Sequence, residues 1–441
     1  MLSHWLLDTD SFATPESLST FQQSIPLEWI EEALADTDKV SIRRRKLPAE
    51  LVVWLVVAMG LFRDRSIAEI VAKLDLSMQN KAGETVAPSA IPQARQRLTH
   101  EPLAKLFEIT ASHWVKTEDR NDTWQGLRLY SIDGTQFRTA DTSELTEHFG
   151  RIKHNATRST EYPIVRLCAL SSLRSRLIRG VAFGPSHHGE VTYGKQLVGQ
   201  AGDNSLTIFD RCYLSAELML NWQRAYMESH WMVPIKSNTK YKVIETYGEN
   251  DFLVEMAVSG HARKLDPSLP ETWSARLVLY PEKQQKQHIT GVLCSLVDPN
   301  LYTAEAIRDV YFERWEIERS YGEIKHQMLE DSILLRSQSV DGVIQEVWGI
   351  LLAYNLVRVE ISRIAAEANV SPLRISFVMA LRDIQDEILW CAIAAPGTIP
   401  KKLKALRARI KRYILPKKRK RPKNRTVRIS KTRYTIQSKY S

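Results

Sequence analysis

The spacing of apolar residues changes along this chain, and each change implies another kind of secondary structure. Up to about residue 120 the sequence is typical of helices, one of which, at 48–62, is almost wholly apolar and therefore expected to be buried. Short runs rich in β-branched residues, typical of strands, follow from about 127 to 300. Helical spacing returns from residue 304. This order predicts an α/β protein in which a helical region precedes a mixed sheet with helices on its faces.

The helical region has features of a DNA-binding module. Short helices joined by short turns are predicted over 48–62, 66–76, 88–99 and 101–115. Ser89 is the expected N-cap of the third helix. That helix carries residue types that bind base edges and phosphates, namely Gln93, Arg95, Gln96 and Arg97. A helix-turn-helix-like module and an ordinary small bundle are equal alternatives at this point.

The later part of the chain combines a sheet with an insertion. Strands are predicted over 127–133, 164–173, 177–184, 206–210 and 231–235, with a helix over 189–201. Two hairpins are predicted around the turns "GEND" and "PEKQQKQ", which places a β-rich insertion at 236–300. The remaining helices are expected over 304–330, 341–367 and about 371–390. The expected units are 1–120 (helical domain), 121–235 (first part of the core), 236–300 (insertion), 301–395 (second part of the core) and 396–441 (basic tail).

The net charge of +10 comes from the end of the chain. Residues 401–441 hold 18 of the 61 Lys and Arg residues and no Asp or Glu. Such a segment, including Lys417, Lys418 and Arg419, either binds nucleic-acid phosphates or is a solubilising extension. The longest apolar run, 51–59, is too short to span a bilayer, and no signal peptide is evident. The scattered cysteines favour a reducing cytoplasm.

Two predicted strands end on an aspartate. "YSIDGT" ends on Asp133 and "TIFDRCY" on Asp210. A carboxylate at the C-terminal end of a strand projects from a rigid support toward the crevice where sites form. Each aspartate also has a simpler explanation, because Asp133 precedes a glycine and could form a turn, while Asp210 could cap a helix.

The helix expected over 311–325 supplies a third acid. At 100° per residue, one arc of about 60° holds four side chains beside the apolar stripe: Tyr311, Arg314, Glu318 and Lys325. Glu313, Glu316 and Glu323 are predicted to face water. An amphipathic helix with i,i+4 ion pairs is the alternative.

Three converging carboxylates repel one another and need cations, and Mg²⁺ prefers such oxygen ligands. Two Mg²⁺ ions about 4 Å apart can activate water and stabilise the leaving oxygen in phosphodiester cleavage. Arg314 and Lys325 would bind phosphates. These residues predict a two-metal site formed by Asp133, Asp210 and Glu318.

The spacing from Tyr311 through Arg314 and Glu318 to Lys325 resembles the Tyr-Arg-Glu-Lys signature of DDE transposases of bacterial insertion sequences. "SIDGT" and "FDRCY" resemble that family's aspartate motifs, and "EVWGILLAYNLVR" resembles the insertion-element-four subgroup. The likeness covers about 25 to 365 and implies a ribonuclease-H-like core interrupted by a β-rich insertion. It implies Mg²⁺ or Mn²⁺ as the metal, and an aromatic of the insertion that holds a flipped base, for which Trp273 is a candidate.

The resemblance and the residues together predict a cut-and-paste transposase of a bacterial insertion sequence. It would bind double-stranded DNA at terminal inverted repeats, cleave it, and join the ends to target DNA as a homodimer, in the cytoplasm and in association with the nucleoid. Tyr311, Arg314 and Lys325 would position the DNA end. A metal-dependent nuclease of the same fold, and a DNA-binding regulator without catalysis, are the alternatives.

Overall fold

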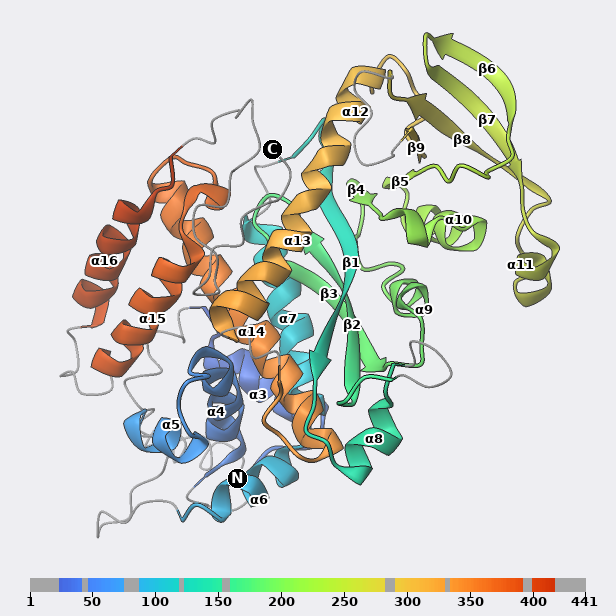
Figure 1. Ribbon diagram of the computed structural model, residues 1–441. Coiled ribbons are helices and arrows are strands. Elements are labelled where there is room, and N and C mark those ends of the chain that lie inside the picture. Colours follow the sequence, from blue (N-terminus) through green and yellow to red (C-terminus); the bar gives the residue numbers. More distant parts are fainter. Residues whose placement is uncertain are drawn as a thin grey trace, which may run out of the picture.

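The computed structural model describes residues 24–41, 47–74, 87–118, 123–152, 159–281, 290–329, 334–391 and 399–416. A long sheet runs through the molecule, and its last strands project away from the N-terminal and C-terminal helices (Figure 1). Helices α7, α13 and α14 lie on one side of the core strands, and α9 and α10 lie on the other side. The predicted α/β class is therefore confirmed.

Nine strands of the described residues form one sheet in the order β3-β2-β1-β4-β5-β9-β8-β7-β6. The core strands are β1 (Arg128–Arg138), β2 (Ile164–Ser172), β3 (Ile178–Pro185), β4 (Ser205–Ile208) and β5 (Ser229–Pro234). β1 pairs antiparallel with β2 and parallel with β4, and β4 pairs parallel with β5. The strands are mostly apolar because both faces are covered by helices.

The two hairpins predicted for 236–300 are present. Their strands are β6 (Lys242–Gly248), β7 (Asp251–Ala257), β8 (Thr272–Leu279) and β9 (Gly291–Cys294), with α11 (Gly260–Leu265) between them. β9 pairs antiparallel with β5, so these strands continue the core sheet. Arg276, fully buried, binds Asp251 through two nitrogens at 2.6 and 2.8 Å and ties β8 to the start of β7.

The N-terminal helices pack against one long helix near the end of the core. They are α3 (Leu27–Asp36), α4 (Ala49–Leu61), α5 (Ile67–Lys73), α6 (Ala90–Leu98) and α7 (Glu101–Glu118). Ser89 occupies the predicted N-cap of α6, but its side chain makes no capping bond. α14 (Val340–Glu367) contacts α4 and α7 most extensively. Almost every residue of α4 is buried, which explains its uniformly apolar sequence.

The helix expected over 304–330 is divided. α12 (Ala304–Tyr311) leads through a 3₁₀ turn, Phe312–Arg314, into α13 (Trp315–Gly322). A π-helical turn, Glu323–Met328, follows. Because 3₁₀ and π turns change the rotation per residue, positions after residue 311 depart from a uniform 100° wheel. The helix expected over 189–201 is also shorter, because α9 covers only Glu190–Lys195.

The end of the described chain is folded and not a free extension. α15 (Phe377–Cys391) is followed by α16 (Ile399–Ile410), which packs against it. Arg407 of α16 binds Glu360 of α14 at 2.6 Å, and Arg409 binds Glu387 of α15 at 2.8 Å. The basic residues up to about 411 therefore include structural ones. The remaining helices are α8 (Ser143–Phe149) and α10 (Ala216–Arg224).

Candidate active site

The sequence predicted that a strand ends at Asp133, and this prediction is wrong. Asp133 lies within β1, which continues to Arg138 because residues 134–138 still pair with β2. The turn alternative is equally wrong. Only the β4 side of the strand ends early, since β4 pairs with Arg128–Ser131 alone. Asp133 therefore stands beside the point where β4 stops.

Asp210 follows the end of β4 and starts a 3₁₀ turn, Arg211–Tyr213, without capping it through its side chain. Glu318 lies on α13. The Arg314 guanidinium joins them, at 3.8 Å from Asp210 Oδ1 and 3.3 Å from Glu318 Oε1. The structure thus brings the predicted acids to one place, around an arginine.

The electrostatics of this place follow from burial. Burial raises the pKa of Asp133 to about 6, and Glu190 and Asp210 add to the rise, while the Gly134 N–H and Arg314 oppose it. Burial lowers the pKa of Arg314, but Tyr311 and the three acids outweigh it and leave that pKa above its usual value. A buried arginine remains charged and neutralises part of the acid cluster.

Tyr311 and Lys325 differ in their surroundings. The Tyr311 side chain is buried, which raises its pKa to about 12. Lys325 is half-buried in the π-helical turn, and burial lowers its pKa while Asp133 opposes the shift. The neighbouring Tyr321 donates a hydrogen bond to the main-chain oxygen of Asp133 at 2.6 Å, which fixes α13 against β1.

The prediction that Glu316 and Glu323 face water is wrong. Glu323 is only 5% exposed and binds both Arg176 and Arg358, and it accepts a hydrogen bond from Tyr354 at 3.0 Å. Glu316 binds Arg176 as well. Glu323 lies in the π-helical turn, where it meets Tyr354 and Arg358 of α14, and Glu316 of α13 meets Arg176 before β3. Glu313 is the most exposed of the three, with a side chain 32% exposed, and it pairs with Arg174 at 3.1 Å.

Glu190 is a fourth acid at this place that the sequence analysis missed. It opens α9, and its carboxylate lies against Gly134, where a Cβ would come within 2.3 Å of Glu190 Cδ. Tyr213 donates to Glu190 Oε1 at 2.7 Å. Two features of the sequence could have indicated Glu190. A glycine directly after Asp133 permits another side chain to approach closely, and Glu190 is an acid at the start of a helix that follows a strand.

The residues predicted to contact DNA differ in whether the structure leaves them accessible. Arg95 of α6 turns inward, binding Gln345 at 3.0 Å, Ser337 at 3.1 Å and the Gly342 carbonyl at 3.0 Å. That position is unsuited to contact with DNA. Gln93 and Arg97 lie on the exposed side of the same helix. Lys417, Lys418 and Arg419 lie outside the described residues.

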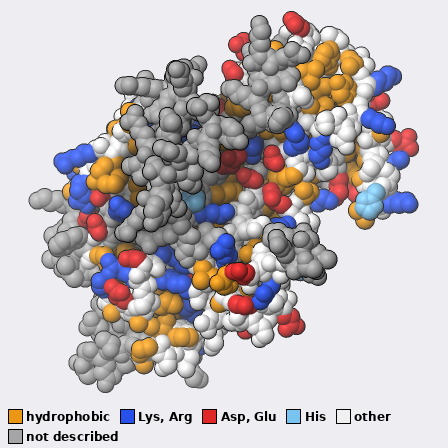
Figure 2. Space-filling view, in the orientation of Figure 1, with side chains coloured by type: hydrophobic (Ala, Val, Ile, Leu, Met, Phe, Trp, Pro, Cys, Tyr) orange, Lys and Arg blue, Asp and Glu red, His pale blue; other side chains and the backbone are white. Residues whose placement is uncertain are grey.

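The aromatic residue predicted to hold a base is buried, and the exposed apolar side chains of the insertion lie elsewhere. Trp273 is 7% exposed and packs against Trp231 at 5.5 Å between ring centroids, so it cannot receive a base there. Exposed apolar side chains lie instead on and before β6, at Tyr241, Val243 and Ile244. Figure 2 shows an orange patch over the β6–β7 hairpin, and basic and acidic side chains gathered near the base of the insertion.

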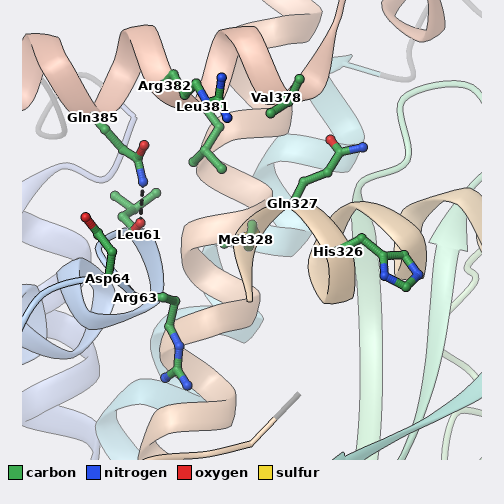
Figure 3. Close-up of a pocket in the computed structure, with 10 residues that line it drawn as sticks. All are labelled: Leu61, Arg63, Asp64, His326, Gln327, Met328, Val378, Leu381, Arg382 and Gln385. Atoms are coloured by element: carbon green, nitrogen blue, oxygen red, sulfur yellow. Dashed lines mark hydrogen bonds between the residues drawn. The ribbon is translucent and has the colours of Figure 1, made fainter. Parts of the chain in front are cut away.

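A cavity of about 450 Å³ lies where the end of α4, the π-helical turn and α15 meet (Figure 3). Gln385 spans it by donating to the Leu61 carbonyl. Arg63, in its wall, is bound to Glu346 and to the Leu334 carbonyl. None of the predicted acids lines this cavity, which joins three segments of the fold.

The donor set suits a hard divalent cation, because the acids present carboxylate oxygens and both Asp210 and Glu318 side chains are 42% exposed. Among the described residues, however, no three His, Cys, Asp or Glu side chains are gathered closely enough to hold a metal ion as they stand. Arg314 lies between Asp210 and Glu318 and separates them. A cation that bound these acids would compete with this guanidinium.

A mixed sheet that brings two aspartates and a helical glutamate together is the arrangement of the DDE transposases, to which the motifs already show a resemblance. Two family models match the chain: "Insertion element 4 transposase N-terminal" over residues 15–108 and "Transposase DDE domain" over residues 124–356. The chain belongs to the insertion-element-four family of DDE transposases.

Two relatives from Escherichia coli strain K12 support this assignment. The transposase InsG for insertion sequence element IS4 is 35% identical over 433 residues, which cover 98% of this chain and 96% of the relative. The putative transposase InsZ is 34% identical over 232 residues, covering 52% of this chain and 76% of the relative.

The family membership establishes several of the predictions in general form. The protein is a transposase, an enzyme that acts on DNA and depends on divalent metal. The DDE domain implies a ribonuclease-H-like core. Within the described residues, one helix, Val340–Glu367, is long and apolar enough to cross a membrane, but most of it is buried inside this fold.

Proposed function

We propose that this transposase moves its element by a cut-and-paste reaction. It binds the terminal inverted repeats, cleaves the flanking strands by hydrolysis, and joins the 3′-hydroxyl ends to target DNA. The observation that carries this proposal is the grouping of Asp133, Asp210 and Glu318 around Arg314. Acids from a strand, a strand end and a helix supply both the negative charge for metal binding and a rigid support.

Asp133, Asp210 and Glu318 hold the divalent ions, which we propose to be two Mg²⁺ or Mn²⁺ ions. Bound there, the ions supply an activated water and stabilise the charge that develops on the phosphate. Although burial raises the pKa of Asp133 to about 6, this carboxyl is still mostly ionised at neutral pH, which is the form that binds a cation. Until a cation binds, Arg314 lies between Asp210 and Glu318 and neutralises part of their charge.

Tyr311, Arg314 and Lys325 position the DNA end. Lys325 is a half-buried cation beside Asp133, where a phosphate of the bound strand would pass. Arg314 presents a planar guanidinium that can exchange carboxylates for phosphate oxygens. Tyr311 contacts Arg314 and restricts its orientation. These residues bind and orient the substrate and need not transfer protons.

The rest of the chain binds and organises DNA. Residues 1–120, with Gln93 and Arg97 exposed on α6, read the repeats. The insertion, 236–300, interrupts the core between 121–235 and 301–395. The basic tail, 396–441, adds affinity that does not depend on sequence. Two ends must be held together for paired joining, so a homodimer acts on double-stranded DNA in the cytoplasm, at the nucleoid.

The roles of the acids are tested by single substitutions. Asp133→Asn, Asp210→Asn and Glu318→Gln should each lower the rate of repeat cleavage by more than about 100-fold, since a direct ligand matters at least as much as the groups behind it. Binding to repeat DNA should remain. Glu305→Gln changes an exposed acid of the adjoining α12 and should leave cleavage unchanged. Full cleavage by any of the three variants removes that residue from the site.

Strand transfer is tested with pre-cut repeat ends. The wild type, given these ends, Mg²⁺ and a supercoiled target, should produce joined products. Cleavage of uncut ends without any joining would make the protein a nuclease on this fold. Repeat binding without magnesium-dependent chemistry would make it a regulator.

A further inference from the structure

The open edge of β1 borders a pocket beside the candidate active site. β4 pairs with β1 only as far as Ser131, and the next described pairing on that edge is the bridge between Arg138 and Leu334. Beside this stretch of β1, and extending over its pair with β2 at Ile164 and Arg166, lies a pocket of about 340 Å³, within the range of ligand sites. It begins at Gly134, the residue after Asp133. We call it the edge pocket.

The charges in the edge pocket suit a phosphate-bearing ligand. Arg138, Arg166 and Lys325 line it, and Gln136 lies opposite Arg166 across the β1–β2 pair. Arg138 is exposed, while Arg166 is held by a 3.1 Å bond to the His188 carbonyl. Glu190 is the one acid among the lining residues, and Tyr213 already donates to its carboxylate. The lining is therefore cationic overall.

A buried hydroxyl in the wall has no partner in the described structure. Thr135 also lines the edge pocket and is only 6% exposed, yet its Oγ1 has no hydrogen-bond partner among the described residues. A buried hydroxyl left unpaired is costly, and such groups are usually satisfied by water or a ligand. The same pocket is lined by three cations, which suits a phosphate or sugar oxygen as the missing partner.

We propose that the edge pocket binds the nucleotide that adjoins the scissile phosphate, with its phosphate or sugar oxygens on Thr135, Arg166 and Lys325. The proposal rests on the proposed function, because it places one nucleotide of the same DNA strand next to Asp133. The pocket would hold that strand along β1, so that the phosphate to be cut lies against the acids.

The test compares two repeat duplexes, one ending at the cleavage position and one carrying a further nucleotide beyond it. Binding is measured by fluorescence anisotropy without divalent metal, so that no chemistry intervenes. The wild type should bind the longer duplex more tightly. Thr135→Val keeps the branched shape but removes the hydroxyl, and should reduce this advantage by about three- to tenfold, the usual effect of one hydrogen bond.

Thr207→Val is the matched control. Thr207 is also fully buried with an unpartnered hydroxyl, but it lies on β4 and does not line the edge pocket. Both variants should melt at or above the wild-type temperature, since an unpaired buried hydroxyl is lost. Thr207→Val should keep the full advantage of the longer duplex.

The outcomes separate this inference from the proposed function. If the wild type binds and cleaves repeat DNA but does not distinguish the two duplexes, the edge pocket is not a nucleotide site. The same conclusion follows if Thr135→Val retains the whole advantage, or if Thr207→Val loses as much. A wild type that neither binds nor cleaves repeat DNA overturns both proposals.

Discussion

Glu323 ties the helix that bears Glu318 to the core through buried charges. Its carboxylate binds Arg176, which precedes β3, and Arg358 of α14, whose guanidinium also lies 5.2 Å from the Phe377 ring centroid. Glu316 shares Arg176. A buried ion pair of this kind is weak evidence for net stability, but breaking it leaves an uncompensated buried charge. The position of α13 thus depends on a residue that looked like a surface acid in the sequence.

We expect Glu323→Ala to lower the free energy of unfolding by about 3 to 5 kcal/mol, because it leaves Arg176 and Arg358 buried without their shared partner. Glu313→Ala, which removes a half-exposed partner of Arg174, should cost only about 0 to 1 kcal/mol. Urea denaturation of both variants measures the difference. Equal and small effects would show that the buried network does not hold α13.

At the scale of elements, α4 and α14 approach closely through glycines. A Cβ at Gly349 would lie 2.5 Å from the Val56 carbonyl oxygen, and one at Gly60 would lie 2.6 Å from the Gly349 carbonyl oxygen. These obstacles are main-chain atoms of rigid helices, so they cannot move aside without separating the helices. The contact attaches the N-terminal helical region to the core.

Gly349→Ala should therefore destabilise the protein by about 1 to 3 kcal/mol, the usual range for overpacking. Gly260→Ala is its control, because a Cβ at the start of α11 meets nothing within 4 Å. In thermal and urea unfolding, Gly349→Ala should have a lower melting temperature and a lower urea midpoint than Gly260→Ala. A neutral Gly349→Ala would mean that α4 and α14 can shift apart at little cost.

A contact between α7 and α14 is expected to depend on pH. The His100 ring, at the start of α7, lies 2.7 Å from Asp341 at the start of α14. The hydrogen bond with Asp341 raises the pKa of His100 above 6.5, and Glu101 adds to the rise, while burial and Lys39 oppose it. A raised histidine pKa stabilises the fold below 6.5, and this contribution is lost as the pH rises through the raised value.

His100→Gln should then cost stability at about pH 5.5 and almost none at about pH 8.5. Both groups are about one-third exposed, so the cost should stay within about 1 kcal/mol. Urea midpoints of wild type and variant across this pH range measure it. A cost that grows toward alkaline pH would contradict the assigned pKa direction.

At the scale of the whole molecule, the basic C-terminal segment divides into two parts. Up to residue 416 it is folded, and α16 contributes Arg407 and Arg409 to ion pairs with α14 and α15. Beyond it, residues 417–441 retain a high density of Lys and Arg. A deletion that begins at residue 401 would remove both parts, so a loss of folding stability could not be distinguished from a loss of DNA affinity.

Deleting 417–441 should weaken binding to repeat DNA and to unrelated DNA by similar factors, because phosphate contacts carry no sequence information. It should also flatten the dependence of log K on log salt. Filter binding at several salt concentrations gives both quantities, and Arg407→Ala serves as a control that affects only folding stability. Loss of repeat preference with unchanged general affinity would contradict this role.

The sequence determined the order of elements and most of the residues of the candidate site. Periodicity located α7, and an unbroken apolar run located α4, since burial imposes apolar positions on a helix. The start of β1 was located within one residue, but the strand runs five residues beyond its predicted end. The aspartate motifs and the spacing around Glu318 identified three acids, and the structure brings them together around Arg314.

Only the tertiary structure decided how individual polar residues are used. A uniform wheel placed Glu323 toward water, whereas in the π-helical turn it is buried between Arg176 and Arg358. Arg95 likewise turns toward α14, and Glu190 reaches Gly134, the residue after Asp133, from α9. The physical reason is that a polar side chain takes its partners from segments distant in sequence, which no local period encodes.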